Sequence, residues 1–276
     1  MIQRPPRTRR LLLMSYALLA YLFLYLPLAN VMLYSFNTSR LFIWPPEGIG
    51  LGWYRALVEN EALLESLTNS FQISAIATVV ATALGTTTAL ALQRLPDRAR
   101  RVLQSVFLVP LLVPGMVTGL GLLLFFTTIS MPLSKSTIVA GHIAFVTPIV
   151  LFVVSARLRN IGPRLPYAAR DLGATPWKAF LWIQLPLIRT AVLGGALLAF
   201  TLSFDEVILT FLLTGTDNTL PVQIYSMLRF GVSPEVNAIY TIILLLSGIV
   251  VLASLRLTRQ SPMNAASRTT IEAPHE

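Results

Sequence analysis

Long apolar stretches recur along almost the whole chain and are separated by polar gaps. Each stretch is about as long as the roughly 20 residues that a helix needs to cross a hydrocarbon core of about 30 Å. The pattern predicts an all-α, polytopic membrane protein with both termini on one side of the bilayer. Its six transmembrane helices are expected at Leu11–Phe36, Asn69–Gln93, Val102–Thr128, Ser136–Ser155, Ala191–Leu213 and Asn237–Leu257.

The spans form one expected domain, residues 11–257, between an N-terminal tail, residues 1–10, and a C-terminal tail, residues 258–276. The first apolar run is too long for the core of a secretion signal, so we expect it to remain as a helix. Prolines inside several spans predict kinked helices, because proline frees a backbone carbonyl of the preceding turn. These prolines are Pro27, Pro110, Pro114 and Pro148. The longest gaps are residues 158–188 on the side of the termini, and residues 37–68 and 214–236 on the opposite side.

Positive charge is distributed unevenly between the two sides of the predicted membrane. Of the 21 Lys and Arg residues, 17 lie in tails or gaps on the side of the termini, and 4 lie on the other side. Cytoplasmic loops carry such an excess, so both termini and residues 158–188 are predicted to be cytoplasmic. The formal net charge of +9 is therefore explained by membrane orientation, and no nucleic-acid partner is expected.

Composition excludes several other classes of protein. Hydrophobic residues make up 55% of the chain and charged residues 12%, against about a quarter charged in soluble domains, so membrane lipid is the expected surrounding. The chain has no cysteine, and neither His142 nor His275 has a second ligand at metal spacing, so no metal or cofactor is expected. A membrane-embedded enzyme has no support either, because no catalytic cluster is evident.

The cytoplasmic gap predicts two short helices joined by a glycine turn. Pro166 suits the first turn of one helix, and Gly173 can end that helix in a left-handed conformation. Thr175 followed by Pro176 is typical of the start of a second helix. Since a simple connection between two spans needs only a few residues, this folded segment, with Ala168 and Ala169 on a close-packing surface, indicates docking to a cytoplasmic partner.

The same gap resembles the EAA motif of ABC importer permeases, which implies the type I permease fold. Matching positions are Ala168, Ala169, Gly173, Ile183, Leu185 and Pro186, whereas Tyr167 stands where the family usually has Glu. By this resemblance these residues, together with Asp171, form the coupling segment that contacts an ATPase dimer. No phosphate-binding loop occurs around Lys135 or Lys178, so ATP hydrolysis is assigned to a separate chain, and this chain is expected not to be an enzyme.

The fifth predicted span contains Ser203, Phe204, Asp205 and Glu206, and no other predicted span holds an acidic residue. A carboxylate at the membrane centre costs about 2.5–3.5 kcal/mol, so two neighbours indicate a functional site. Adjacent helical residues point about 100° apart. One carboxylate can therefore line a pathway while the other braces a neighbouring helix, and negative charge in the pathway favours a cationic substrate.

Residues 200–215 and 220–238, with Trp53-Tyr54 and Asn69-Ser70, are similar to the second permease of spermidine/putrescine importers. The resemblance implies a bacterial inner-membrane location and three kinds of partner: a different permease, an ATPase dimer and a periplasmic substrate-binding protein. It also implies that Asp205 and Glu206 handle the ammonium groups of a polyamine, with Tyr225 and Glu235 near the external entry.

Two other functions remain open at this point. Relatives of this permease type also carry opines and amino-acid-like solutes, because the binding protein supplies most of the selectivity. A stand-alone channel or secondary carrier is the further alternative, although the chain has no tandem halves with matching interrupted spans.

Overall fold

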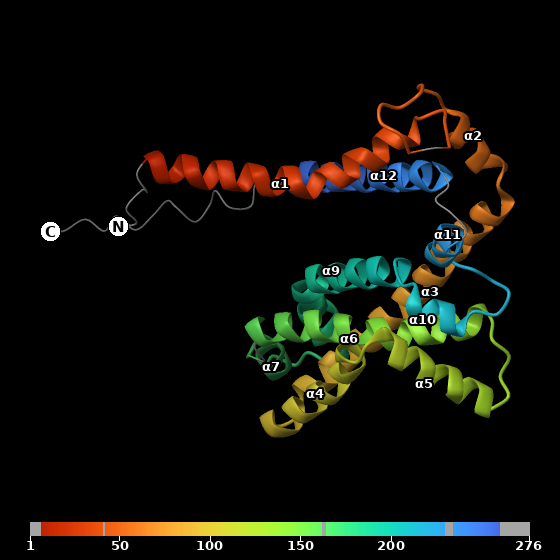
Figure 1. The fold of residues 1–276 in the computed structure, drawn as a ribbon. Coiled ribbons are helices and arrows are strands. Elements are labelled where there is room, and N and C mark those ends of the chain that lie inside the picture. Colours follow the sequence, from red (N-terminus) through yellow and green to blue (C-terminus); the bar gives the residue numbers. More distant parts are fainter. Residues whose placement is uncertain (1–6, 41, 162–163, 230–233, 260–276) are drawn as a thin grey trace. The chain divides into compact units, whose positions relative to one another are not determined.

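The computed structural model describes residues 7–40, 42–161, 164–229 and 234–259 (Figure 1). Those residues form helices and no strand, apart from one isolated bridge between Asn37 and Ile49, so the all-α prediction is confirmed. The chain divides into two units, one of residues 1–60 and 231–276 and the other of residues 61–230.

In the first unit, α1 (Arg7–Ser35) and α12 (Pro234–Arg259) pack side by side (Figure 1), and α2 (Gly52–Glu59) packs on α12. Two aromatic residues of α2 fasten this helix to the end of α1 and to the loop that follows it. Trp53 Nε1 donates to the carbonyl of Asn37 at 2.6 Å, and the Tyr54 hydroxyl lies 2.8 Å from Ser35 Oγ. Trp53 and Tyr54 thus hold the start of α2 against the end of α1.

The second unit is built around three long helices, α3 (Glu61–Gln93), α6 (Lys135–Ile161) and α9 (Leu185–Phe204), which pack against one another. Small residues allow their backbones to approach. A Cβ at Gly85 of α3 would lie 2.8 Å from the Cβ of Val150 on α6, so a larger side chain there would separate the two helices. Such contacts favour helix association within lipid, where apolar burial alone provides no driving force.

The third predicted span is broken in two. Residues Asp97–Leu112 form α4 and Gly115–Thr128 form α5, and the two helices are bent by 95° at Val113 and Pro114. The predicted kink is confirmed at Pro114, whereas Pro27, Pro110 and Pro148 lie inside helices that continue past them. Pro114 disfavours a helical conformation for Val113, whose backbone is extended at φ −77° and ψ 133°.

The fifth predicted span also differs from a single helix. Helix α9 ends at Phe204, and a short helix, α10 (Ile208–Leu213), follows after three residues. Among the described residues, four helices are long and apolar enough to cross a bilayer, or five if α4 and α5 count as one bent span. The sixth predicted span corresponds to α12, whose apolar stretch within the described side chains is Pro234–Ile249.

Candidate functional site

The two predicted carboxylates lie at the break between α9 and α10. Asp205 is the last residue to donate a backbone hydrogen bond into α9, from its N–H to the carbonyl of Thr201 at 3.1 Å. Glu206 caps the next helix, because its Oε1 accepts from the N–H of Leu209 at 3.0 Å. The same oxygen also lies near the start of α5, since a Cβ at Gly115 would come within 3.7 Å of it. Glu206 therefore caps α10 and lies near the start of α5, and partial positive charge at a helix start stabilises a carboxylate.

Asp205 has different surroundings from its neighbour. Its side chain is exposed, and none of the ion pairs among the described residues involves it. Next to it in the chain, Phe204 belongs to an aromatic cluster with Phe200 and with Phe71 of α3, whose ring centroids are 5.2–6.1 Å apart. An exposed carboxylate that follows an aromatic cluster offers the two groups that attract an organic ammonium ion.

His142 of α6 joins the two sides of the break. Its Nδ1 lies 2.7 Å from Ser203 Oγ at the end of α9, and its Nε2 lies 2.8 Å from Thr210 Oγ1 in α10. Thr210 already donates its hydroxyl proton to the carbonyl of Glu206 at 2.9 Å. In a neutral ring, Nε2 therefore donates to Thr210 while Nδ1 accepts from Ser203. The side chain is 1% exposed, so His142, which looks isolated in the sequence, fixes the geometry of the break.

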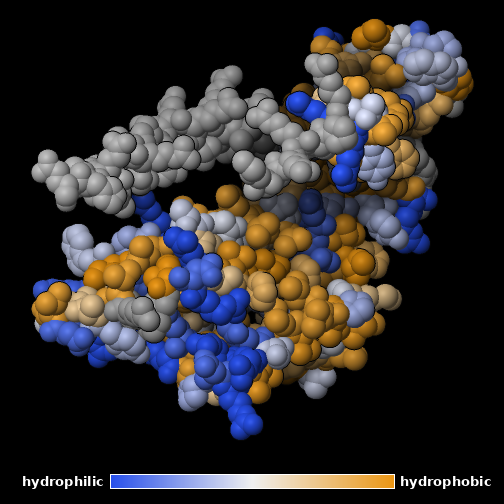
Figure 2. Space-filling view, turned by 90° about the vertical axis from the view of Figure 1, so that its left-hand side faces the viewer, coloured by the Kyte–Doolittle hydropathy of each residue, from blue (hydrophilic) through white to orange (hydrophobic). Residues whose placement is uncertain are grey.

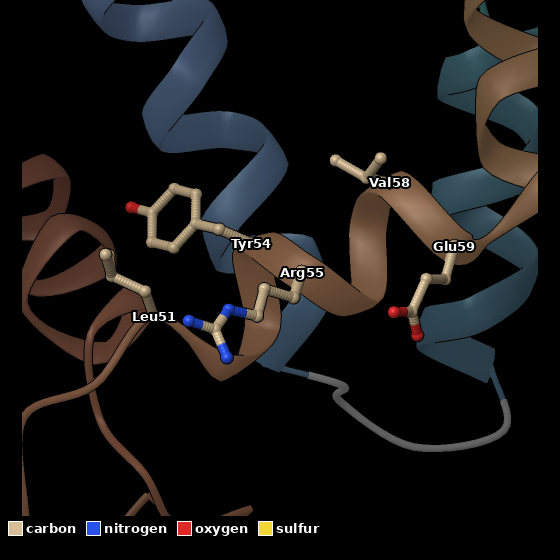
Figure 3. Close-up of a pocket in the computed structure, with 5 residues that line it drawn as sticks. All are labelled: Leu51, Tyr54, Arg55, Val58 and Glu59. Carbon is tan, nitrogen blue, oxygen red and sulfur yellow. The ribbon is translucent and has the colours of Figure 1, made fainter.

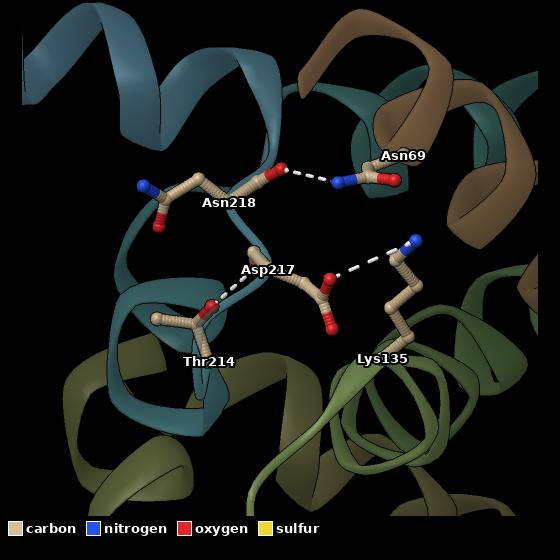
Figure 4. A network of polar contacts seen from close by, with 5 residues as sticks. All are labelled: Asn69, Lys135, Thr214, Asp217 and Asn218. Carbon is tan, nitrogen blue, oxygen red and sulfur yellow. Dashed lines mark hydrogen bonds and ion pairs between the residues drawn. The ribbon is translucent and has the colours of Figure 1, made fainter. Parts of the chain in front are cut away.

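The residues that follow α10 are fastened to α3 and α6 by a polar network (Figure 4). Lys135 Nζ lies 3.7 Å from Asp217 Oδ1, and Asn69 Nδ2 donates to the carbonyl of Asn218 at 3.0 Å. The N–H of Leu220 donates to Ser70 Oγ at 2.7 Å. Residues 69–70 thus contact Leu220, the first residue of another run that carries the resemblance, and Asn218 in the loop before it.

The two remaining pathway candidates belong to different units. Tyr225 is on α11 (Leu220–Arg229) in the second unit, where its exposed ring contacts Phe211 of α10 at 6.5 Å between centroids. Glu235 lies in the first turn of α12 in the first unit and accepts a hydrogen bond from Asn60 Nδ2 at 3.4 Å. Tyr225 therefore contacts the short helix after the break, whereas Glu235 belongs to the other unit.

The first unit carries a shallow hollow of about 350 Å³ along α2 (Figure 3). Leu51, Tyr54, Arg55, Val58 and Glu59 line it. Its walls are mainly apolar, with one guanidinium and one carboxylate at the rim. Because these charges come from α2 itself, the hollow lacks the convergent polar groups of a specific small-molecule site.

The predicted helix–turn–helix of residues 158–188 is confirmed. Helix α7 (Arg164–Asp171) ends in a Schellman motif, in which the N–H of Ala174 donates to Ala169 and that of Gly173 to Arg170, both at 2.9 Å. Gly173 has a φ of +87°, a conformation that glycine adopts without strain. Thr175 Oγ1 caps α8 (Pro176–Ala179) by accepting from the N–H of Lys178 at 3.3 Å.

The second short helix does not end before the membrane span. A π-helical turn, Phe180–Gln184, connects it directly to α9. Ile183 and Leu185 are half-buried at this junction, and Pro186 lies in the first turn of α9. Of the alanine pair, Ala169 is buried within this chain, whereas Ala168 is exposed.

The apolar residues at the glycine turn are exposed. Tyr167 and Trp177 are exposed, and Leu172, just before Gly173, is 90% exposed. Asp171, at the end of α7, is exposed as well. The turn therefore presents a mixed apolar and polar tip.

Comparisons with known proteins identify relatives over most of the chain. The family described as "Binding-protein-dependent transport system inner membrane component" matches residues 81–261. The chain is 36% identical over 252 residues to the spermidine/putrescine transport system permease protein PotC of Escherichia coli K12, covering 91% of this chain and 95% of that protein. It is 40% identical over 243 residues to the putrescine transport system permease protein PotI of the same strain, covering 84% and 85%.

Solved structures share the fold at lower sequence identity. A chain from a bacterial ABC transporter that imports the acidic polysaccharide alginate superposes with a TM-score of 0.70 at 18% identity, covering 92% of this chain and 99% of that chain. A chain of an amino acid ABC transporter gives a TM-score of 0.56 at 18% identity, covering 75% of this chain and all of the other. At these identities the likeness concerns the fold alone.

Proposed function

Because this chain belongs to the family of binding-protein-dependent transport system inner membrane components, and is a permease subunit of an ABC importer, we propose that it forms half of a pathway for a polyamine. The two relatives named above, at 36% and 40% identity, are polyamine permeases. The fold is that of the type I importer permeases, and ATP hydrolysis belongs to a partner chain.

The exposed Asp205 carboxylate at the helix break is the observation that supports a cationic substrate. This carboxylate has no ion-pair partner among the described residues. In the chain it directly follows Phe204, whose ring contacts those of Phe71 and Phe200. A polyamine carries ammonium groups separated by methylene chains. The carboxylate would attract an ammonium group while the aromatic faces contact the adjacent methylene and cationic groups.

The same function implies roles for the coupling segment, for the partner chains and for the orientation of the termini. Tyr167, Ala168, Ala169, Asp171, Gly173, Ile183, Leu185 and Pro186 would form the segment that couples to the ATPase dimer. A different permease would complete the pathway, and a periplasmic binding protein would deliver the substrate, with Tyr225 and Glu235 near the entry. Both termini would face the cytoplasm of a bacterium, in accord with the 17 to 4 distribution of Lys and Arg.

Uptake of labelled putrescine and spermidine into proteoliposomes that contain the whole importer tests this proposal. We expect Asp205→Asn to lower ATP-dependent uptake at least about tenfold, because a charged hydrogen bond contributes about 1.5–3 kcal/mol. Glu206→Gln should have a smaller effect, since an amide oxygen can still accept from Leu209. Glu65→Gln, which removes an exposed carboxylate from α3, is the matched control and should leave uptake unchanged.

Three results would count against the proposal. Normal polyamine uptake by the Asp205→Asn, Glu206→Gln double variant would exclude these carboxylates from substrate handling. Uptake of an opine or amino acid in place of polyamines would change the substrate class and leave the permease role intact. Gradient-driven uptake by this chain alone, without the ATPase, would support a stand-alone carrier.

A further inference from the structure

A polar pocket of about 330 Å³ lies in the second unit, where α3 ends, α4 begins and α6 ends. Its polar lining comes from Gln93, Asp97, Arg100, Gln104, Ser155 and Arg159. None of these residues belongs to the proposed polyamine pathway or to the coupling segment. The pocket is therefore separate from both assignments made above.

Ser155 indicates that the pocket is built to hold a polar group. Its side chain is 5% exposed, and its hydroxyl has no hydrogen-bond partner among the described residues. A helical serine or threonine commonly donates to the carbonyl four residues earlier, as Thr147 of the same helix does to Ile143 at 2.6 Å. Ser155 leaves this bond unmade, and a buried hydroxyl without a partner costs free energy that a ligand oxygen would recover.

The other donors around the pocket suit an anion. Arg100 is paired with Asp97, whereas Arg159 has no carboxylate partner among the described residues. Gln93 uses its side-chain oxygen to accept from Gln184 Nε2 at 2.8 Å, which leaves its own amide group free to donate. Two guanidinium groups against one carboxylate give the pocket a net positive charge. Guanidinium groups bind phosphate oxygens with paired, charge-assisted hydrogen bonds.

The surface beside the pocket is apolar. Arg100 and Gln104 lie on one face of α4, and the same face continues at positions spaced by a turn of helix to Phe107 and Leu111, both exposed. Figure 2, which looks at the end of the second unit where α4 begins, shows hydrophilic side chains gathered there between hydrophobic areas. A positively charged pocket that borders an exposed apolar stripe is complementary to a phospholipid, which has an anionic phosphate next to apolar acyl chains.

We propose that this pocket, formed by Arg100, Arg159 and the unpartnered hydroxyl of Ser155, binds the phosphate of an anionic phospholipid, with an acyl chain along Phe107 and Leu111. Basic pockets between transmembrane helices on the cytoplasmic side bind anionic headgroups in this way. The proposal does not depend on which solute the importer carries. A lipid held here would join α3, α4 and α6 next to the junction that leads into the coupling segment.

Native mass spectrometry of the assembled importer, purified in detergent, tests the proposal. Phosphatidylglycerol, phosphatidylcholine and inorganic phosphate serve as separate probes. We expect phosphatidylglycerol to remain bound at collision energies that remove phosphatidylcholine. Arg159→Gln should lower phosphatidylglycerol occupancy about fivefold, and Ser155→Ala about twofold. Arg101→Gln, an exposed arginine of α4 outside the pocket lining, is the matched control and should retain the lipid.

Gln104→Leu is a second variant for the case in which Arg159→Gln fails to assemble. It removes a hydrogen-bond donor from the pocket and leaves both arginines in place. It too should lower phosphatidylglycerol occupancy. Equal occupancy in the wild-type protein and the assembled pocket variants would overturn the proposal. An equal loss in Arg101→Gln would mean unspecific surface attraction and would overturn it as well. Displacement of phosphatidylglycerol by millimolar inorganic phosphate would show a free-phosphate site and exclude the lipid.

Discussion

Two neighbouring carboxylates of the same chemistry have different surroundings in the break between α9 and α10. Asp205 directly follows the end of α9, whereas Glu206 caps the start of α10. Glu206 accepts a backbone hydrogen bond and lies near the start of α5, whereas Asp205 is exposed and without an ion pair among the described residues. The break is held by His142, through hydroxyls on each side of it. At the scale of single residues, the buried His142 therefore joins the two helix ends that flank the exposed Asp205.

Replacing His142 should weaken the fold at this break. His142→Ala would leave the hydroxyls of Ser203 and Thr210 without their shared partner and open a void, so we expect the free energy of unfolding to fall by about 2–4 kcal/mol. Thermal unfolding of the purified importer in detergent measures the change. Phe152→Ala, which truncates an exposed aromatic residue on the same helix, is the control and should have little effect. Equal unfolding temperatures for His142→Ala and the wild-type protein would contradict the bracing role.

At the scale of elements, the connector between α6 and α9 owes its shape to local backbone chemistry. The Schellman motif, the left-handed Gly173 and the Thr175 cap each involve residues a few positions apart. The connector is also continuous with α9 through the π-helical turn. A helical path therefore runs without a break from Pro176, just after the glycine turn, to Phe204 beside Asp205.

A substitution at Gly173 tests the turn without changing its contacts. Nothing lies within 4 Å of a Cβ built at this position, so Gly173→Ala acts only through the strained left-handed backbone, at about 1–2 kcal/mol. We expect roughly a five- to thirtyfold weaker association with the ATPase, measured by titration of the purified ATPase against the permease pair. Gly194→Ala in α9 also meets open space but has a helical backbone, and it should bind normally.

Gly173→Asn provides a graded check, because asparagine tolerates the left-handed conformation better than alanine. Its ATPase affinity should fall between those of the wild-type protein and Gly173→Ala. Wild-type affinity in Gly173→Ala would mean that the turn does not contribute to coupling.

At the scale of the whole molecule, the distribution of charge predicts its orientation. The proposed cytoplasmic side holds 17 of the 21 Lys and Arg residues, and the apolar spans between the gaps cannot reverse without moving that charge through lipid. The absence of cysteine makes this orientation directly measurable, because a single introduced thiol has no background in the chain.

Single-cysteine labelling in intact spheroplasts checks the orientation. We expect a membrane-impermeant maleimide to label Thr216→Cys, in the exposed loop after α10, and to label Leu172→Cys at the glycine turn only after permeabilisation. Both positions are exposed, so a difference in labelling reports the side of the membrane and not burial. Labelling of Leu172→Cys in sealed spheroplasts would reverse the topology and exclude contact with a cytoplasmic ATPase.

The sequence alone determined the features that depend on neighbours within a few residues. Hydropathy predicted the membrane helices, and the order of proline, glycine and threonine predicted the connector, including the left-handed conformation of Gly173. It also identified Asp205 and Glu206 as unusual, because charge within an apolar run is visible without any structure. Pro114 predicted a kink, but the bend of 95° and the separation of α4 from α5 came from the structure.

Tertiary structure alone decided how residues far apart in the chain meet. His142 contacts Ser203 and Thr210, 61 and 68 positions away, and Asn69 contacts Asn218 across 149 positions. Helices that are apolar around most of their circumference, as transmembrane helices are, carry little periodic signal about which face packs inside. The sequence therefore revealed which segments enter the membrane, whereas the packing of their small residues decided which polar groups become partners.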